Sequence, residues 1–130
     1  MPPDTTSAPI CIVDDDLSLG RALSRLLRSV GICSRAFTDP REFLQYAEAN
    51  PVPLAILDVM MPWLSGLEVQ QRLRQIAPET AVIVLTGRSD PATCEAAIAG
   101  GARGYFRKPF DDEVLLAVIR DVLQLPGNPQ

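Results

Sequence analysis

The sequence contains no histidine, and its acidic residues outnumber its basic ones. Without histidine, the chain cannot build a Ser-His-Asp or Cys-His nucleophile system, or a histidine-ligated metal site, from its own residues. The 12 Lys and Arg against 16 Asp and Glu leave a net charge of −4. We therefore expect no direct binding to nucleic acid, because phosphate recognition needs a basic face. Any chemistry has to rely on carboxylates, hydroxyls, lysine and the backbone.

Long apolar runs and cysteine clusters are lacking too. No run approaches the about 20 residues of a membrane span, and the N-terminal "MPPDTTSAP" has no basic-then-apolar signal-peptide layout. We expect no membrane association and a cytoplasmic location. Cys11, Cys33 and Cys94 are widely spaced, which argues against a zinc site or a disulfide framework. We expect them to be buried structural residues.

What is present is an ordinary globular composition with alternating strand-like and helix-like segments. With 130 residues, 47% of them hydrophobic and 22% charged, the chain suits one domain with a sizeable core. Short Ile- and Val-rich runs predict strands, and apolar residues at helical spacing predict helices. Strands are expected in "APICIVDDD", "ICSRAF", "LAIL" before Asp58, "TAVIVLT" and "GYFRK". Helices are expected from about Leu19 to Gly31, from Asp39, from Ser65 through Ile76, from Ser89 or Asp90 to Gly100, and from Asp111 to about Leu125.

Two helix starts carry a capping-box pattern, in which a polar N-cap residue is followed three positions later by glutamate. These are Asp39 with Glu42 and Ser65 with Glu68. Five βα units imply an α/β fold, a parallel sheet with helices on both faces. A flavodoxin-like (βα)5 doubly wound sandwich of strand order 2-1-3-4-5 fits five strands, whereas a Rossmann sheet usually has about six. We expect an N-terminal tail over 1–8, the domain over 9–125, and a linker or C-terminal tail beginning at 126–130.

Polar residues follow four of the predicted strands, at the edge where open α/β sheets bind ligands. Each has a purely structural alternative, since Asp16 suits a helix cap, Asp58 a turn and Lys108 the surface. Because four strand ends agree, we favour a shared site. The positions are Asp14, Asp15 and Asp16 after the first strand, Asp58 after the third, Thr86-Gly87 after the fourth and Lys108-Pro109 after the fifth.

Converging carboxylates would repel one another and raise at least one pKa, unless a cation and a lysine compensated their charge. The candidate ligands are all oxygen atoms, so Mg²⁺ fits better than zinc, with Mn²⁺ as a substitute. This set favours phosphate chemistry, in which Asp58 attacks phosphorus and holds the group as an acyl phosphate. The metal and Lys108 would neutralise charge on the transferring oxygens.

The motifs "IVDDD", "LDVMMPWLSGLEV", "VLTG" and "GARGYFRKPF" occur in this order along the chain. With this order and spacing, the sequence resembles the receiver domain of two-component response regulators over essentially its whole length. The resemblance implies a phosphorylation-controlled signalling switch that catalyses its own phosphorylation and slow dephosphorylation. The phosphoryl donor would be a sensor histidine kinase, a phosphotransfer protein or a small phosphodonor. It also allows a homodimer on phosphorylation and, from "VLTG" and "KPF", favours regulators of transcription with a helix-turn-helix output.

The resemblance assigns a role to each matching residue. The phosphoacceptor would be Asp58, the direct Mg²⁺ ligand Asp15, and Asp14 would act mainly through water. Thr86 would draw inward to the phosphoryl group, which leaves space for a switch residue to rotate and change the face of the fourth helix, fifth strand and fifth helix. The remaining roles are the metal-binding backbone carbonyl of Met60, phosphoryl pairing by Lys108, a cis peptide at Pro109, the aromatic switch Tyr105, and tuning of phosphoryl lifetime by Met60 and Arg88.

The sequence also departs from the family pattern. Trp63 stands where a small or polar residue is usual, and would be a lid over the site, a partner contact or a partly packed loop residue. Gly20 precedes Arg21 where the family often has arginine directly, and Met60 predicts slow self-hydrolysis because it bonds an attacking water poorly. Three alternatives stay open: a pseudo-receiver that only binds partners, a haloacid-dehalogenase-type hydrolase, which needs an aspartate at Met60, and a flavodoxin-like cofactor protein.

Overall fold

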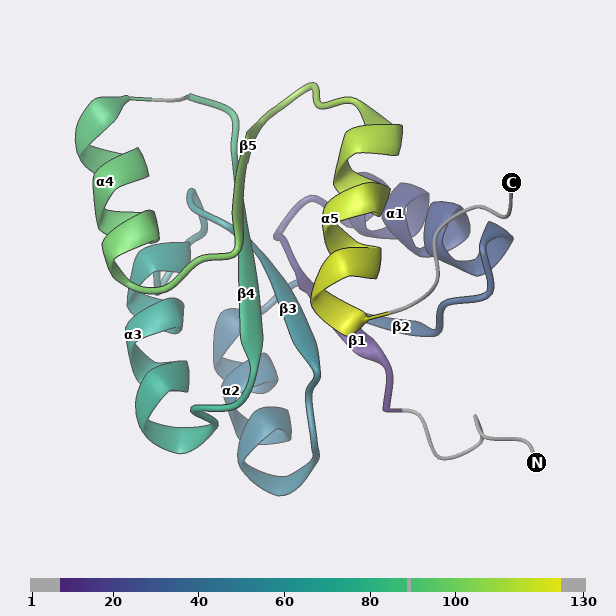
Figure 1. Cartoon of the computed structure of the whole chain (residues 1–130). Helices are drawn as coiled ribbons and strands as arrows, with labels where there is room; N and C mark the ends of the chain where they lie inside the picture. Colours follow the sequence, from purple (N-terminus) through teal and green to yellow (C-terminus); the bar gives the residue numbers. More distant parts are fainter. Residues whose placement is uncertain (1–7, 89, 125–130) are drawn as a thin grey trace.

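The structure is a computed structural model, and it describes residues 8–88 and 90–124. Strands and helices alternate along the described chain as the hydrophobic patterns predict (Figure 1). The elements are β1 (Ile10–Val13), α1 (Leu17–Ser29), β2 (Ser34–Phe37), α2 (Pro40–Ala49), β3 (Leu54–Asp58), α3 (Gly66–Ile76), β4 (Ala81–Thr86), α4 (Pro91–Ala99), β5 (Gly104–Arg107) and α5 (Asp112–Leu123).

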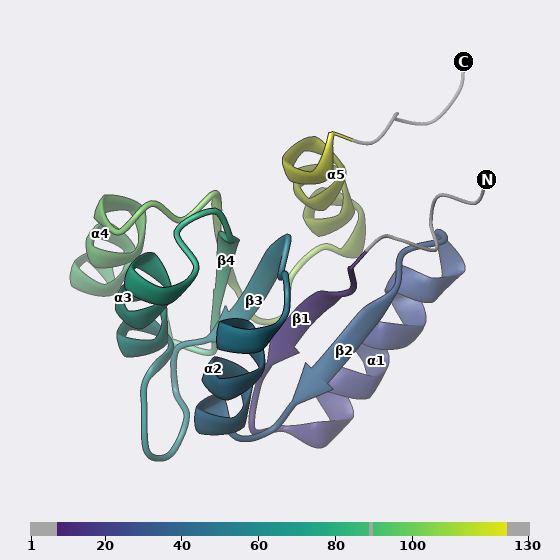
Figure 2. The same ribbon diagram turned by 90° about the horizontal axis from the view of Figure 1, so that it is seen from below.

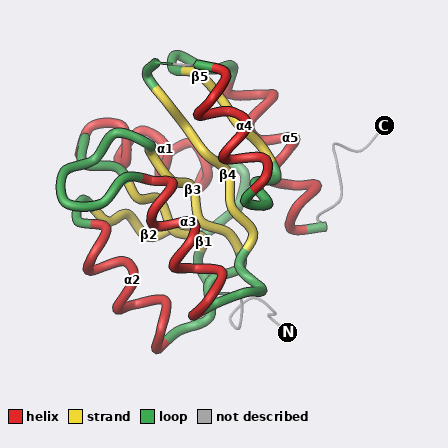
Figure 3. Tube along the Cα trace, turned by 90° about the vertical axis from the view of Figure 1, so that its left-hand side faces the viewer, coloured by secondary structure: helices red, strands yellow, loops and turns green. Residues whose placement is uncertain are grey.

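The five strands form one parallel sheet in the order β2-β1-β3-β4-β5, which confirms the predicted flavodoxin-like fold. Helices α1 and α5 cover one face, and α2, α3 and α4 cover the other (Figure 2). The central strands are therefore enclosed between helices, as the tube view also shows (Figure 3). Strands buried on both faces need continuous apolar runs, and every residue of β1 and β3 is buried.

The helix starts follow the capping patterns in two cases out of three. Asp16 caps α1 by accepting a hydrogen bond from the Ser18 backbone N–H at 2.9 Å, as the structural interpretation of that residue predicts. Ser65 and Glu68 form the expected capping box. Asp39 caps α2, but its carboxylate binds the backbone and guanidinium of Arg41. In the described part of the chain the Glu42 side chain accepts no hydrogen bond from the Asp39 N–H, so that predicted capping box is wrong.

Some boundaries and burial predictions also change. Strand β2 begins at Ser34 because it is an edge strand with exposed residues, and α5 ends at Leu123. Cys11 is buried, but Cys33 is exposed and Cys94 only half-buried. The prediction that all three cysteines are buried is therefore wrong. Ser89, Leu125, residues 1–7 and the predicted C-terminal tail lie outside the described residues. Within the described ranges, no helix has the length and apolar character needed to cross a membrane.

Candidate functional site

Three carboxylates meet at the carboxyl edge of the sheet. Asp14 and Asp15 follow β1, Asp58 ends β3, and β1 and β3 are neighbours, so the fold joins residues 44 positions apart. One carboxylate oxygen from each lies within 4.8 Å of the other two. Asp14 and Asp58 are only 3% and 4% exposed, whereas Asp15 is exposed. The predicted convergence of these acidic residues is therefore observed.

Lys108 supplies the positive charge of this cluster. Its Nζ lies 2.9 Å from Asp14 Oδ2 and 3.2 Å from Asp58 Oδ1. The second oxygen of Asp14 accepts the backbone N–H of Asp16 at 2.8 Å. Lys108 directly follows β5, its N–H donates to the Thr86 carbonyl at 2.8 Å, and its peptide bond to Pro109 is cis. The backbone thus aims the lysine across two strands towards both buried carboxylates.

The buried charges perturb one another. Burial raises the pKa of the Asp58 carboxyl above its ordinary value, the charge of Asp14 raises it further, and Lys108 opposes the rise. Burial lowers the pKa of Lys108, but its hydrogen bond to Asp14 and the charges of Asp14 and Asp58 outweigh burial and raise it. Ionised Asp58 is therefore only partly compensated by the one ammonium group. Such a perturbed carboxylate at a ligand-binding edge indicates a functional site.

The residues present fit a hard divalent cation. Three carboxylates stand against one lysine, and the donors are oxygen atoms, which Mg²⁺ prefers. Both oxygens of Asp14 already accept hydrogen bonds, from Lys108 and from the Asp16 backbone. Asp15 is exposed and has an oxygen within the same 4.8 Å cluster, so the cluster is open to solvent at Asp15.

Among the described residues, neither Thr86 nor Tyr105 is hydrogen-bonded to Asp58. Thr86 is fully buried, and its hydroxyl donates to the Arg88 carbonyl at 2.7 Å and accepts the Arg88 N–H at 3.1 Å. The side chain of Arg88 is exposed. Tyr105 packs against the core cluster on the α2–α4 side, and its buried hydroxyl has no hydrogen-bond partner among the described residues. The Tyr105 ring is thus half-buried against the core in this structure.

The loop between β3 and α3, residues 59–65, carries features that the sequence did not reveal. Met60 is 66% exposed beside the acidic cluster. Trp63 has a left-handed φ of 71°, and its ring lies under the guanidinium of Arg41, 4.2 Å from the indole centroid. At the end of the loop, a Cβ on Gly66 would lie 2.4 Å from the Asp58 carbonyl oxygen. Nothing in the helical pattern of "DPREF" singled out Arg41, because the contact joins elements distant in sequence.

Comparison with known proteins agrees with this geometry. A family model described as the response regulator receiver domain matches residues 10–120. The chain belongs to this family. The response regulator protein TodT of Pseudomonas putida is 39% identical over 116 residues, which cover 89% of this chain and 51% of TodT. This receiver chain thus spans about half the length of the curated relatives it matches.

Two solved structures extend the comparison. A response regulator receiver protein from Burkholderia phymatum is 42% identical, with a TM-score of 0.80, and the match covers 94% of this chain and all of that one. A response regulator protein from Burkholderia pseudomallei, solved with a phosphorylated aspartic acid, a calcium ion and citrate, is 26% identical with a TM-score of 0.79. That match covers 92% of this chain and 76% of the other.

The family assignment confirms the resemblance seen in the sequence motifs and identifies a signalling switch of two-component systems. It takes precedence over a haloacid-dehalogenase-type hydrolase and a flavodoxin-like cofactor protein. Receiver domains bind Mg²⁺ through acidic residues, and this chain provides the Asp14, Asp15 and Asp58 cluster. The family also implies interaction with a kinase or another phosphodonor.

Proposed function

We propose that this receiver domain takes up a phosphoryl group on Asp58, in a Mg²⁺-dependent reaction, and so switches an output partner or domain. The observation that carries the proposal is the position of the Asp58 carboxylate. It is buried at the end of a central strand, 3.2 Å from Lys108 Nζ, and shares a 4.8 Å cluster with two further carboxylates. The phosphorylated aspartic acid of the Burkholderia pseudomallei relative supports the same chemistry here.

The reaction is a transfer between a nitrogen and an oxygen. A carboxylate oxygen of Asp58 attacks phosphorus, the P–N bond of a phosphohistidine breaks, and the imidazole nitrogen keeps the electron pair. The chain contains no histidine, so a sensor kinase or phosphotransfer protein supplies the imidazole, and a small phosphodonor can replace it. Lys108, already 3.2 Å from Asp58, neutralises charge on the transferring group.

Asp15, Asp58 and the backbone carbonyl of Met60 would hold Mg²⁺ or Mn²⁺ directly, and Asp14 would act mainly through water. The hydrogen bonds to both oxygens of Asp14 support its indirect role. When bound, the cation supplies charge neutralisation for the phosphoryl oxygens. The raised pKa of Asp58 supports the need for it, because the nucleophile must be ionised to attack.

The switch would use Thr86 and Tyr105. Phosphorylation draws the Thr86 hydroxyl from the Arg88 backbone towards the phosphoryl group, and Tyr105 then occupies the vacated space. The unpartnered, buried Tyr105 hydroxyl supports a residue with more than one stable position. The change reaches the surface formed by α4, β5 and α5, which would bind the output partner or a second copy of the chain. Met60 and Arg88 would set the lifetime of the phosphoryl group.

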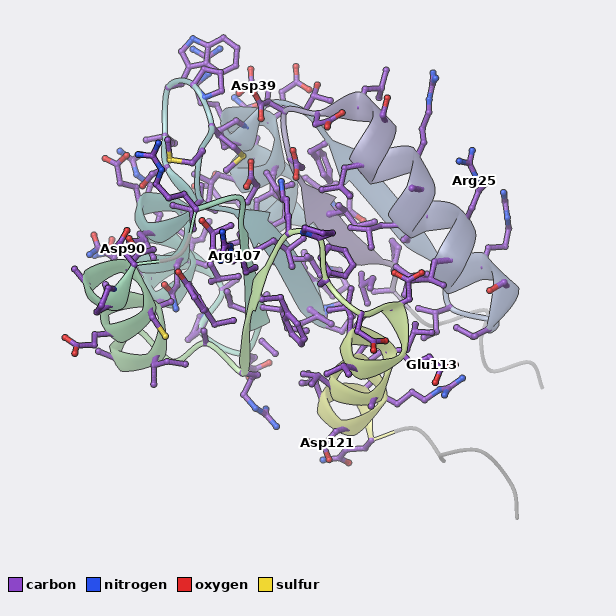
Figure 4. All side chains as sticks on the ribbon, turned by 90° about the horizontal axis from the view of Figure 1, so that it is seen from above. Arg25, Asp39, Asp90, Arg107, Glu113 and Asp121 are labelled. Carbon is purple, nitrogen blue, oxygen red and sulfur yellow. The ribbon has the colours of Figure 1, made fainter. Side chains whose placement is uncertain are left out.

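The test is labelling of the intact chain with Mg²⁺ and radiolabelled acetyl phosphate. We expect one phosphate per chain, released by hydroxylamine as an acyl phosphate, and no label in Asp58→Asn or in EDTA. Asp121→Asn, a matched change at an exposed position of α5 (Figure 4), should label like wild type. A wild-type chain that takes up no label would overturn the proposal in favour of a pseudo-receiver.

A further inference from the structure

The β3–α3 loop is tied to helix α2 by a contact between two exposed side chains. The guanidinium carbon of Arg41 lies 4.2 Å from the centroid of the Trp63 ring, well inside the range of a cation–π interaction. Trp63 is 61% exposed, so the contact forms at the surface, next to the edge of the sheet that carries the acidic cluster. The indole ring lies against α2, which favours a packed role over a lid above Asp58.

The Arg41 guanidinium is oriented for this contact by a bidentate ion pair. Its Nε and Nη2 donate to the two carboxylate oxygens of Asp39 at 3.0 and 2.9 Å. Asp39 is also the N-cap of α2 and accepts the Arg41 backbone N–H at 2.9 Å. A bidentate pair fixes the plane of the guanidinium. Figure 4 shows Asp39 at the periphery of the molecule. The helix start therefore presents a fixed cationic surface to the loop.

A tight turn sets the backbone of Trp63, because the Leu64 N–H donates to the Pro62 carbonyl at 2.8 Å across it. The Trp63 φ of 71° is left-handed, which costs a residue with a side chain about 1–2 kcal/mol. The two ends of the loop are otherwise fixed. Gly66 N–H donates to the Val59 carbonyl at 3.0 Å, and Ser65 forms the capping box of α3. At the tip of the loop, the Trp63 ring stacks on Arg41 of α2.

We propose that Arg41 and Trp63 are positioning residues for the cation site. Their stacking holds the β3–α3 loop so that the backbone carbonyl of Met60 stays beside Asp58. The inference rests on the proposed function, since Met60 matters through the cation. Neither side chain touches the reacting atoms, and both act through the backbone that joins them to the site.

The test measures cation binding directly, by electron paramagnetic resonance of free Mn²⁺ in titrations of the intact chain. Arg41→Ala and Trp63→Ala should each weaken Mn²⁺ binding about fivefold, as expected for loss of one exposed cation–π contact. The double variant should lose no more than either single one, because the two residues act as one unit. Trp63→Phe, which keeps an aromatic face, should restore most of the affinity.

Two further measurements separate positioning from general damage to the fold. Trp63 is the only tryptophan, so acrylamide quenching of its fluorescence should rise in Arg41→Ala. Labelling by acetyl phosphate should fall at low Mg²⁺ and recover at saturating Mg²⁺, which a distorted site would not allow. Arg25→Ala, a matched change at an exposed arginine that projects from α1 (Figure 4), should alter none of these values.

The outcomes are distinct. Unchanged Mn²⁺ affinity in Arg41→Ala and Trp63→Ala would overturn the inference, as would unchanged acrylamide quenching in Arg41→Ala. Lower Mn²⁺ affinity in both variants, together with a wild-type chain that takes up no phosphate, would retain the positioning role and overturn only the proposed phosphorylation.

Discussion

At the scale of single residues, the main conflict in this receiver domain is the burial of Asp58. A carboxylate that is 4% exposed loses hydration, and ionisation is costly unless partners compensate it. Lys108 is shared between Asp58 and Asp14, so one ammonium serves two buried carboxylates. Burial and the uncompensated charge raise the pKa of the Asp58 carboxyl above its ordinary value and favour binding of an added cation.

This conflict predicts a pH-dependent gain in stability for Asp58→Asn. Because the native pKa of Asp58 is raised above the unfolded value of 3.8, the native state binds its proton more tightly. Its ionisation therefore destabilises the native state above that pKa, and the penalty disappears as pH falls towards 3.8. In EDTA at pH 7, Asp58→Asn should raise the free energy of unfolding by about 1 kcal/mol, while Lys108 keeps Asp14 as partner.

Urea unfolding of both proteins at pH 7 and pH 4, in EDTA, measures the difference. The advantage of Asp58→Asn should shrink at the lower pH. A variant that is less stable than wild type at pH 7, or an advantage that grows on acidification, would show that the buried carboxylate stabilises the native state.

The positions of single residues were predictable where they follow a strand in a motif, and unpredictable where they depend on a contact between distant elements. Asp14, Asp15, Asp58 and Lys108 converge because each directly follows a strand of known order. The sequence did not point to Arg41, since its partner Trp63 lies in the β3–α3 loop. The helical pattern of α2 indicates only which of its residues face the core. Cys33 looked buried from its apolar neighbours but belongs to the stretch before the shortened edge strand β2.

At the scale of elements, α3 is packed directly onto the end of β3, which carries Asp58. Gly66, the first residue of α3, allows this approach, because a Cβ there would meet Asp58 backbone atoms at 2.4 and 2.9 Å. Backbone cannot move aside as a flexible side chain can. The helix start, the β3–α3 loop and the Asp58 peptide therefore form one unit, and the close packing needs glycine.

Gly66→Ala should therefore be strongly destabilising, by about 3 kcal/mol, through overpacking against the backbone. Gly87→Ala is the matched control, since its φ is not left-handed and no described atom lies within 4 Å of the added Cβ. The control should stay within about 0.5 kcal/mol of wild type. Thermal unfolding followed by circular dichroism gives both values, and equal effects of the two substitutions would contradict the close approach.

Element order was predictable because hydrophobic periodicity is local, but some element ends were not. The Ser65–Glu68 box formed as expected, whereas at α2 the guanidinium of Arg41 occupies both oxygens of Asp39. Asp39 still accepts the Arg41 backbone N–H and caps the helix, and the half of the box that is missing among the described residues is the bond from the Asp39 N–H to the Glu42 side chain. Sequence spacing alone does not show whether the glutamate side chain turns back to the cap.

At the scale of the whole molecule, the candidate cation site forms only in the folded chain. Asp15 and Asp58 are far apart in sequence and meet because β1 and β3 pair as neighbours. The strand order that produces this pairing was predictable from five βα units with right-handed crossovers. An unfolded chain has no such cluster, so a cation that binds the native state stabilises the fold by mass action.

Removal of the divalent cation should therefore lower the melting temperature. At a Mg²⁺ concentration about ten times the dissociation constant, binding contributes about 1.4 kcal/mol, a shift of roughly 3–6 °C for a domain of this size. Asp15→Asn should abolish the difference between MgCl₂ and EDTA, because Asp15 is the exposed member of the cluster. Asp121→Asn, at an exposed position of α5, should retain it. Equal Mg²⁺ shifts in wild type and Asp15→Asn, measured by calorimetry at matched ionic strength, would place the cation away from this cluster.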